Sequence, residues 1–143
     1  MKLIDIYNEY KDNYKDYVLI IESGIFYSVF NKDTSIIYSL LNYKIKKSSN
    51  NYIVGFPTSN LEIVLNNLNN NNISYLVINK DLDNNYFIKD KYISLNNKHN
   101  DYIIDINRLR YLNNRIDNIY KELNKKVFDS NIEKLLFEIE NLL

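Results

Sequence analysis

Two short, uninterrupted apolar runs constrain the fold of this chain more than any other feature. Residues 17–21 read YVLII, and residues 73–78 read ISYLVI, with Ser74 as the one polar position. A strand with one solvent-exposed face alternates apolar and polar residues, whereas an unbroken apolar run is typical of a strand buried on both faces. We therefore expect both runs to be strands of a helix-covered sheet, with residues 73–78 central and nearly fully buried.

Helical and strand-like patterns alternate around these runs. Apolar residues at helical spacing predict helices over the first 14 residues or so, residues 34–41 and residues 61–70. Further strands are expected over residues 25–30, 43–46, 52–54, 86–88 and 92–95, the last two as a hairpin. The fold class expected is α/β (α+β), with a mixed sheet of five to six strands flanked by helices.

Several polar residues are expected to mark where helices begin. Asn31 and Asp33 are suited to cap the helix over residues 34–41. Ser59 and Glu62 have the spacing of a capping box, in which each side chain bonds a free backbone N–H.

The pattern changes after about residue 100, and two amphipathic helices joined as a hairpin are expected there. The first has a coiled-coil-like seam of Leu109, Leu112, Ile116, Ile119 and Leu123. The second has a wider stripe of Ile132, Leu135, Leu136, Ile139, Leu142 and Leu143. We expect a domain over residues 1–100 and a helical appendage over residues 101–143.

The surplus apolar surface of this appendage predicts an interface with a partner protein or with a second copy, a dimer being the first expectation. The alternative is that the surplus packs back on the sheet.

Composition excludes several classes of site. The chain has 18 basic and 18 acidic residues, and this balance argues against strong non-specific nucleic-acid binding, which depends on neutralising phosphates. It has no Cys, and its one His, His99, stands in a polar stretch expected at the surface, so no zinc site of the usual kind is expected. With two glycines and no phosphate-binding loop motif, no cofactor is expected, and neither binding nor hydrolysis of ATP.

No segment has the character of a signal peptide or a membrane span, so a cytoplasmic protein is the default expectation.

An ordered set of short motifs follows the first apolar run. Residues 24–27 read GIFY, residues 54–57 read VGFP after a predicted helix, and the second apolar run comes after one more helix. In this order and spacing, the motifs resemble the N-terminal, mismatch-probing domain of the MutS family. There an apolar strand precedes a G-D-F-Y-E segment, and a later strand ends in A-G-[IVF]-P. The resemblance covers roughly residues 1–80.

The resemblance implies a role for Phe26. In the family, the matching Phe wedges into the duplex from the minor groove and stacks on the mispaired base. An apolar wedge unstacks a base step most easily where pairing is already weak. The family's Glu, which bonds the mispaired base, is replaced here by Ser28, and the Asp before the Phe by Ile25. These replacements predict weak duplex binding with little mismatch preference. From the sequence pattern alone, the alternative for Phe26 is a buried strand aromatic.

Lys44, Lys46 and Lys47 lie near a predicted strand end, where they can meet phosphates; a solvated basic turn is the alternative. Nothing after about residue 100 resembles the family's connector domain, so an ATP-driven cycle is not expected of this chain alone.

The leading interpretation is a non-catalytic module that contacts mismatched or distorted DNA with a partner, in DNA repair or related DNA metabolism. The second is a protein–protein adaptor that keeps the fold without DNA contact. A nuclease-like enzyme is the third, although the scattered carboxylates give no positive sign of one.

Overall fold

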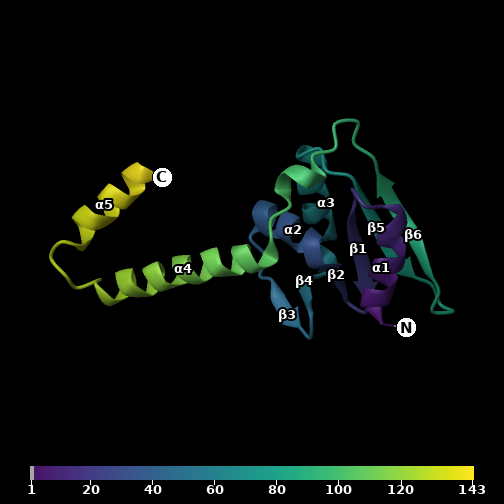
Figure 1. Cartoon of the computed structure of the whole chain (residues 1–143), viewed down its shortest axis with the longest axis horizontal. Coiled ribbons are helices and arrows are strands. Elements are labelled where there is room, and N and C mark those ends of the chain that lie inside the picture. The colour runs from purple at the N-terminus through teal and green to yellow at the C-terminus, as the bar shows by residue number, and fades with distance from the viewer. Residues whose placement is uncertain (1) are drawn as a thin grey trace. The chain divides into compact units, whose positions relative to one another are not determined.

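A six-stranded mixed sheet organises the N-terminal part of the chain (Figure 1). The computed structural model describes residues 2–143, which divide into two compact units, the first ending at Ile106 and the second running from Asn107 to Leu143. The strands are β1 (Val18–Ser23), β2 (Phe26–Phe30), β3 (Lys46–Ser48), β4 (Asn51–Pro57), β5 (Tyr75–Lys80) and β6 (Tyr86–Tyr92). Their order is β3-β4-β2-β1-β5-β6, with β1 and β5 parallel and every other pair antiparallel. The expected fold class is confirmed.

The two apolar runs form neighbouring interior strands of the sheet, and both are buried as predicted, although β5 lies next to the edge strand β6. β1 and β5 lie side by side in register from Val18 opposite Tyr75 to Ile21 opposite Ile78. These eight residues are all buried. The runs are unbroken because helices cover this part of the sheet on both faces, so neither set of alternating side chains meets water.

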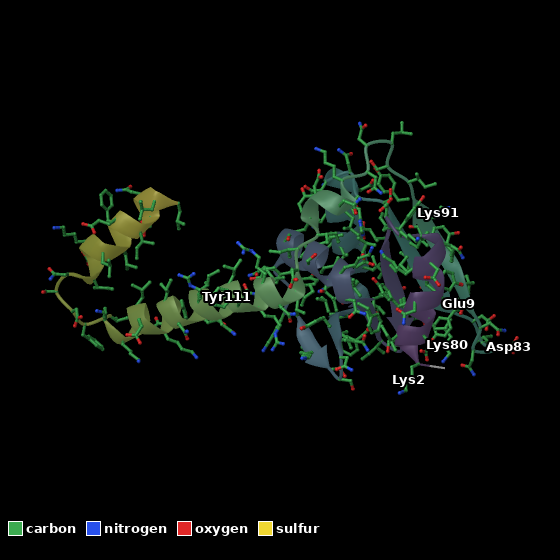
Figure 2. The ribbon with its side chains drawn as sticks, in the orientation of Figure 1. Lys2, Glu9, Lys80, Asp83, Lys91 and Tyr111 are labelled. Carbon is green, nitrogen blue, oxygen red and sulfur yellow. The ribbon has the colours of Figure 1, made fainter. Side chains whose placement is uncertain are left out.

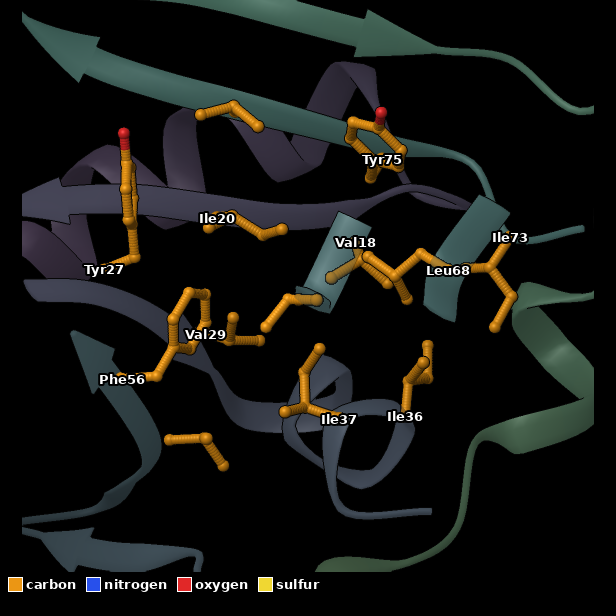
Figure 3. Close-up of a cluster of buried hydrophobic side chains, with 13 residues drawn as sticks. Val18, Ile20, Tyr27, Val29, Ile36, Ile37, Phe56, Leu68, Ile73 and Tyr75 are labelled. Carbon is orange, nitrogen blue, oxygen red and sulfur yellow. The ribbon is translucent and has the colours of Figure 1, made fainter. Parts of the chain in front are cut away.

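Three helices provide this cover: α1 (Leu3–Asn13), α2 (Thr34–Leu41) and α3 (Leu61–Asn70). On one face, α2 and α3 pack on side chains such as Val18, Val29 and Phe56 (Figure 3). On the other face, Ile6 and Tyr7 of α1 pack on a second cluster that includes Leu19 and Phe30. α1 therefore covers the β1–β5 side of its face, and β2 only at the Phe30 end.

Three local expectations were wrong. The strand expected over residues 43–46 lies at Lys46–Ser48 instead, since the segment after α2 pairs with β4 only from Lys46 onward. Residues 92–95 form no separate strand, because β6 runs without a break to Tyr92 and pairs with β5 instead. The Ser59–Glu62 capping box does not form, since a 3-10 turn, η2 (Thr58–Asn60), precedes α3 and places Asn60 at its N-cap.

The second unit contains most of α4 (Ile106–Lys125) and all of α5 (Ile132–Leu142), joined by residues 126–131. Much of the apolar surface of the two helices stays exposed, including Ile116 and Ile119 on α4 and Leu136 and Leu142 on α5. Within residues 2–143, no helix combines the length and apolar character needed to cross a bilayer.

A buried polar cluster around Asp33 connects distant parts of the first unit. The Asp33 carboxylate, which is fully buried, accepts hydrogen bonds from Lys11 Nζ at 2.8 and 2.9 Å and from Tyr7 Oη at 3.2 Å. It also accepts one from the backbone N–H of Leu19 at 3.3 Å, and His99 Nε2 lies 3.0 Å from its Oδ1. The cluster joins α1, β1, the start of α2 and η3 (His99–Tyr102).

Two sequence-based expectations fail at this cluster. His99 is buried rather than at the surface, because Asp33 on one side and Asn100 on the other satisfy its ring nitrogens. Asp33 stands at the N-cap of α2 but makes no side-chain capping bond, since its oxygens are turned to Lys11 and His99.

Burial sets the electrostatics of the groups around Asp33. Desolvation lowers the pKa of Lys11, and the attraction of Asp33 opposes this shift. Desolvation also raises the pKa of Tyr7, and here the neighbouring Asp33 carboxylate adds to the shift.

We predict that Asp33→Ala destabilises the protein strongly. The substitution leaves the Lys11 ammonium buried without its counter-ion, and breaking a buried ion pair by removing one partner costs ~3–5 kcal/mol. The free energy of unfolding, measured with urea, checks this. Asp83→Ala is the matched control, since Asp83 lies exposed in the turn between β5 and β6 (Figure 2), where substitutions change stability by ~0.5 kcal/mol or less. Equal stability of the two variants would show that the cluster does not hold the fold.

Candidate nucleic-acid interface

A tight turn between β1 and β2 brings two apolar side chains to the surface. Ser23 pairs with Phe26, so Gly24 and Ile25 form a two-residue turn, and Gly24 has a φ of 62°. A positive φ at the first turn residue is the pattern of a type II′ hairpin, where glycine is preferred because it has no Cβ. The turn leaves Ile25 75% exposed and Phe26 46% exposed.

Phe26 lies on the sheet face that α1 covers elsewhere. Side chains alternate along β2, so Tyr27 and Val29 enter the core beneath α2 and α3, while Phe26, Ser28 and Phe30 share the opposite face. α1 reaches Phe30, whose ring centroid is 5.7 Å from that of Tyr7. The Phe26 end of the strand is left open, and Ser28 is half-buried.

β4 lies beside the open end of β2, and the two strands together form an exposed corner of the sheet, the β2–β4 corner. Pro57 is opposite Phe26, and Gly55 is opposite Ser28. Gly55 is exposed, and a Cβ built on it would meet only the backbone oxygen of Tyr27, at 3.9 Å. Gly55 therefore places no side chain beside Ser28, and Phe26 and Pro57 are the exposed apolar residues next to it.

An open groove runs along the same edge. β3 pairs with β4 only as far as Ile53, so the outer edge of β4 is unpaired from Val54 to Pro57. The groove is lined by Phe26, Asn42, Tyr43, Lys44, Lys46, Ile53, Gly55, Phe56, Pro57 and Asn60. This lining includes two lysines and no carboxylate, so the groove is locally basic on a chain of zero net charge.

The three candidate lysines do not point the same way. Lys46 is opposite Ile53 on β4 and therefore shares the face of Phe26 and Gly55. Lys47 is one residue further along β3, on the other face, where its Nζ lies 6.0 Å from the ring centroid of Tyr52. The structure thus brings Phe26, Lys44 and Lys46 to one groove, with Ser28 beside it.

Some site features had little or no signal in the sequence. Tyr43 and Asn60 line the groove, and their side chains are in contact, with Asn60 Nδ2 3.5 Å from Tyr43 Oη. They come from the segments after α2 and before α3, whose approach depends on the fold. Exposure of Ile25 did have a signal, since a short turn around Gly24 leaves no room to bury it.

The predicted interface residues of the C-terminal helices differ in exposure. Leu109 is buried and Leu112 is half-buried. The other predicted interface residues are exposed: Ile116, Ile119, Leu135, Leu136, Leu142 and Leu143.

Comparison with known proteins identifies the family to which this fold belongs. The family model for MutS domain I matches residues 2–84, more than half of the 143 residues, and includes β1 to β5 with the groove. No curated protein matches the chain. Domain I of MutS is a non-catalytic DNA-recognition domain. The chain belongs to the MutS domain I family.

Proposed function

We propose that the chain is a non-catalytic module that binds mismatched or distorted duplex DNA at the β2–β4 corner and acts with a partner protein in DNA repair or related DNA metabolism. The observation that carries this proposal is the exposed ring of Phe26 beside Lys44 and Lys46 in one groove. A core aromatic needs no such surroundings, whereas a wedge needs an exposed apolar tip with cations placed to hold the backbone.

The chemistry of the corner favours deformed DNA over particular bases. Ile25 and Phe26 offer apolar surface that can enter a base step but carries no hydrogen-bonding groups. Ser28 offers a neutral hydroxyl, which distinguishes bases less sharply than a carboxylate does. Unpaired or weakly stacked steps cost least to open, so they are the preferred substrates on this account.

A protein–protein adaptor that keeps the fold without DNA contact is the second candidate. Its support is the zero net charge, the Ser at position 28 and the exposed apolar helices α4 and α5. The two proposals differ in a measurable way, since DNA binding depends on the exposed Phe26 only if the chain is a DNA-binding module.

We predict that Phe26→Ala weakens binding to a duplex with one unpaired base by about 5- to 150-fold at low salt, because base–aromatic stacking contributes ~1–3 kcal/mol. Fluorescence anisotropy of labelled duplexes measures the effect. Phe87→Ala is a matched control, because Phe87 on β6 is 44% exposed and lies at the other end of the sheet. Loss of affinity that is equal in the two variants, or absent from both, would place the DNA contact away from Phe26, and no measurable binding by the unsubstituted protein would favour the adaptor.

The lysines are predicted to act through phosphate charge. Lys44→Ala and Lys46→Ala should each lower affinity for all duplexes alike and reduce the slope of log affinity against log salt by about 1. Lys47→Ala is the internal comparison, since Lys47 lies on the other face of β3, and its effect should be smaller. An effect of Lys47→Ala as large as that of Lys46→Ala would place the DNA outside the groove.

A further inference from the structure

The apolar residues of α4 and α5 form surfaces that the described part of the chain does not cover. On α4, Ile116 is 61% and Ile119 is 57% exposed, and on α5, Leu142 is 85% exposed. The exposed set also includes Leu135 and Leu136. Contiguous exposed apolar surface of this kind marks an interface on soluble proteins.

The two helices differ in length, so α5 cannot cover the whole of α4 within one chain. α4 has 20 residues and α5 has 11, so they are about 30 and 16 Å long at ~1.5 Å per residue. Folded back on its own α4, α5 would cover only about half of it. The stripe on α5 is also wider than one neighbour needs, because Leu135 and Leu136 lie about 100° apart around the axis.

The charges of the two helices are complementary. α4 carries five basic residues, Arg108, Arg110, Arg115, Lys121 and Lys125, against two acidic ones, Asp117 and Glu122. α5 carries three acidic residues, Glu133, Glu138 and Glu140, against one basic residue, Lys134. The net positive charge of α4 therefore favours contact with the net negative α5 over contact with another α4, provided that the apolar faces of the two helices meet.

The heptad positions show which charges flank the apolar seam. With Leu109, Ile116 and Leu123 at position a, Arg108, Arg115 and Glu122 take position g. With Ile132 and Ile139 at position a on α5, Glu138 takes position g. Side chains at g border the seam, and in an antiparallel pair of helices they face the g positions of the partner, so Arg115 and Glu138 are suited to meet across an antiparallel α4–α5 contact.

We propose that the occupant of these surfaces is a second copy of this chain. The α4 and α5 helices of two copies assemble into a four-helix bundle, in which α5 of one copy packs on α4 of the other. Each helix of such a bundle has two neighbours, which suits the wide stripe of α5 and the uncovered length of α4. The proposed function includes a partner protein, and the inference rests on it only in identifying that partner as a second copy. Dimerisation itself is measured without DNA.

A charge exchange between copies tests this arrangement. Full-length protein should sediment as a dimer. Arg115→Glu and Glu138→Arg, each alone, place like charges across two equivalent contacts and should weaken the dimer by roughly tenfold. An equal mixture of the two variants should restore dimers, because opposite charges then face each other at both contacts. Charges that paired only within one chain would gain nothing from mixing.

An apolar variant gives an independent test. Ile119→Asp places a carboxylate in the seam and should yield monomers, whereas Asn114→Asp adds the same charge on the opposite side of α4 and should leave the dimer intact. Circular dichroism shows whether each variant keeps its fold. A wild-type protein that stays monomeric at high concentration, or a mixture of charge variants that does not restore dimers, would overturn the proposal, whatever the DNA measurements show.

Discussion

The ion pair between Asp33 and Lys11 is the interaction on which the arrangement of the first unit depends. A buried carboxylate is stable only when its oxygens are fully occupied, and here their partners come from α1, β1 and η3. Asp33 follows β2 after a single 3-10 turn, η1 (Asn31–Asp33), so the end of β2 is held where α1 crosses the sheet. Burying a carboxylate costs free energy. The hydrogen bonds that compensate for this cost fix the position of α1 relative to the sheet more specifically than apolar contacts alone.

The exposed corner follows from this placement. α1 is fixed over β1, β5 and the Phe30 end of β2, so Phe26, Gly55 and Pro57 stay exposed on that face within residues 2–143, and Ser28 is half-buried. The same strand thus contributes Tyr27 and Val29 to the core and Phe26 to solvent. A rigid sheet behind an exposed aromatic is a favourable arrangement for a wedge, because the ring enters a base step without first being ordered.

The periodicity of apolar residues predicted most helices and strands, because these depend on neighbours along the chain. The two apolar runs identified β1 and β5 as buried strands, and the spacing of Leu61, Val64, Leu65 and Leu68 identified α3. It did not predict the Asp33 cluster, because Asp33 and His99 lie far in sequence from Tyr7 and Lys11, and Lys11 and His99 each look like an ordinary surface residue. For the site, the motif order pointed to Phe26, but the opposite directions of Lys46 and Lys47 depend on the β3–β4 register.

Residue-resolved NMR during titration with a short duplex containing one unpaired base locates the surface at which the chain meets DNA. Binding at the Phe26 corner gives the largest changes in backbone amide shift at Ile25, Phe26, Ser28, Lys46 and Gly55. Unchanged shifts at these positions, with changes confined to β6 or to the C-terminal helices, would contradict it.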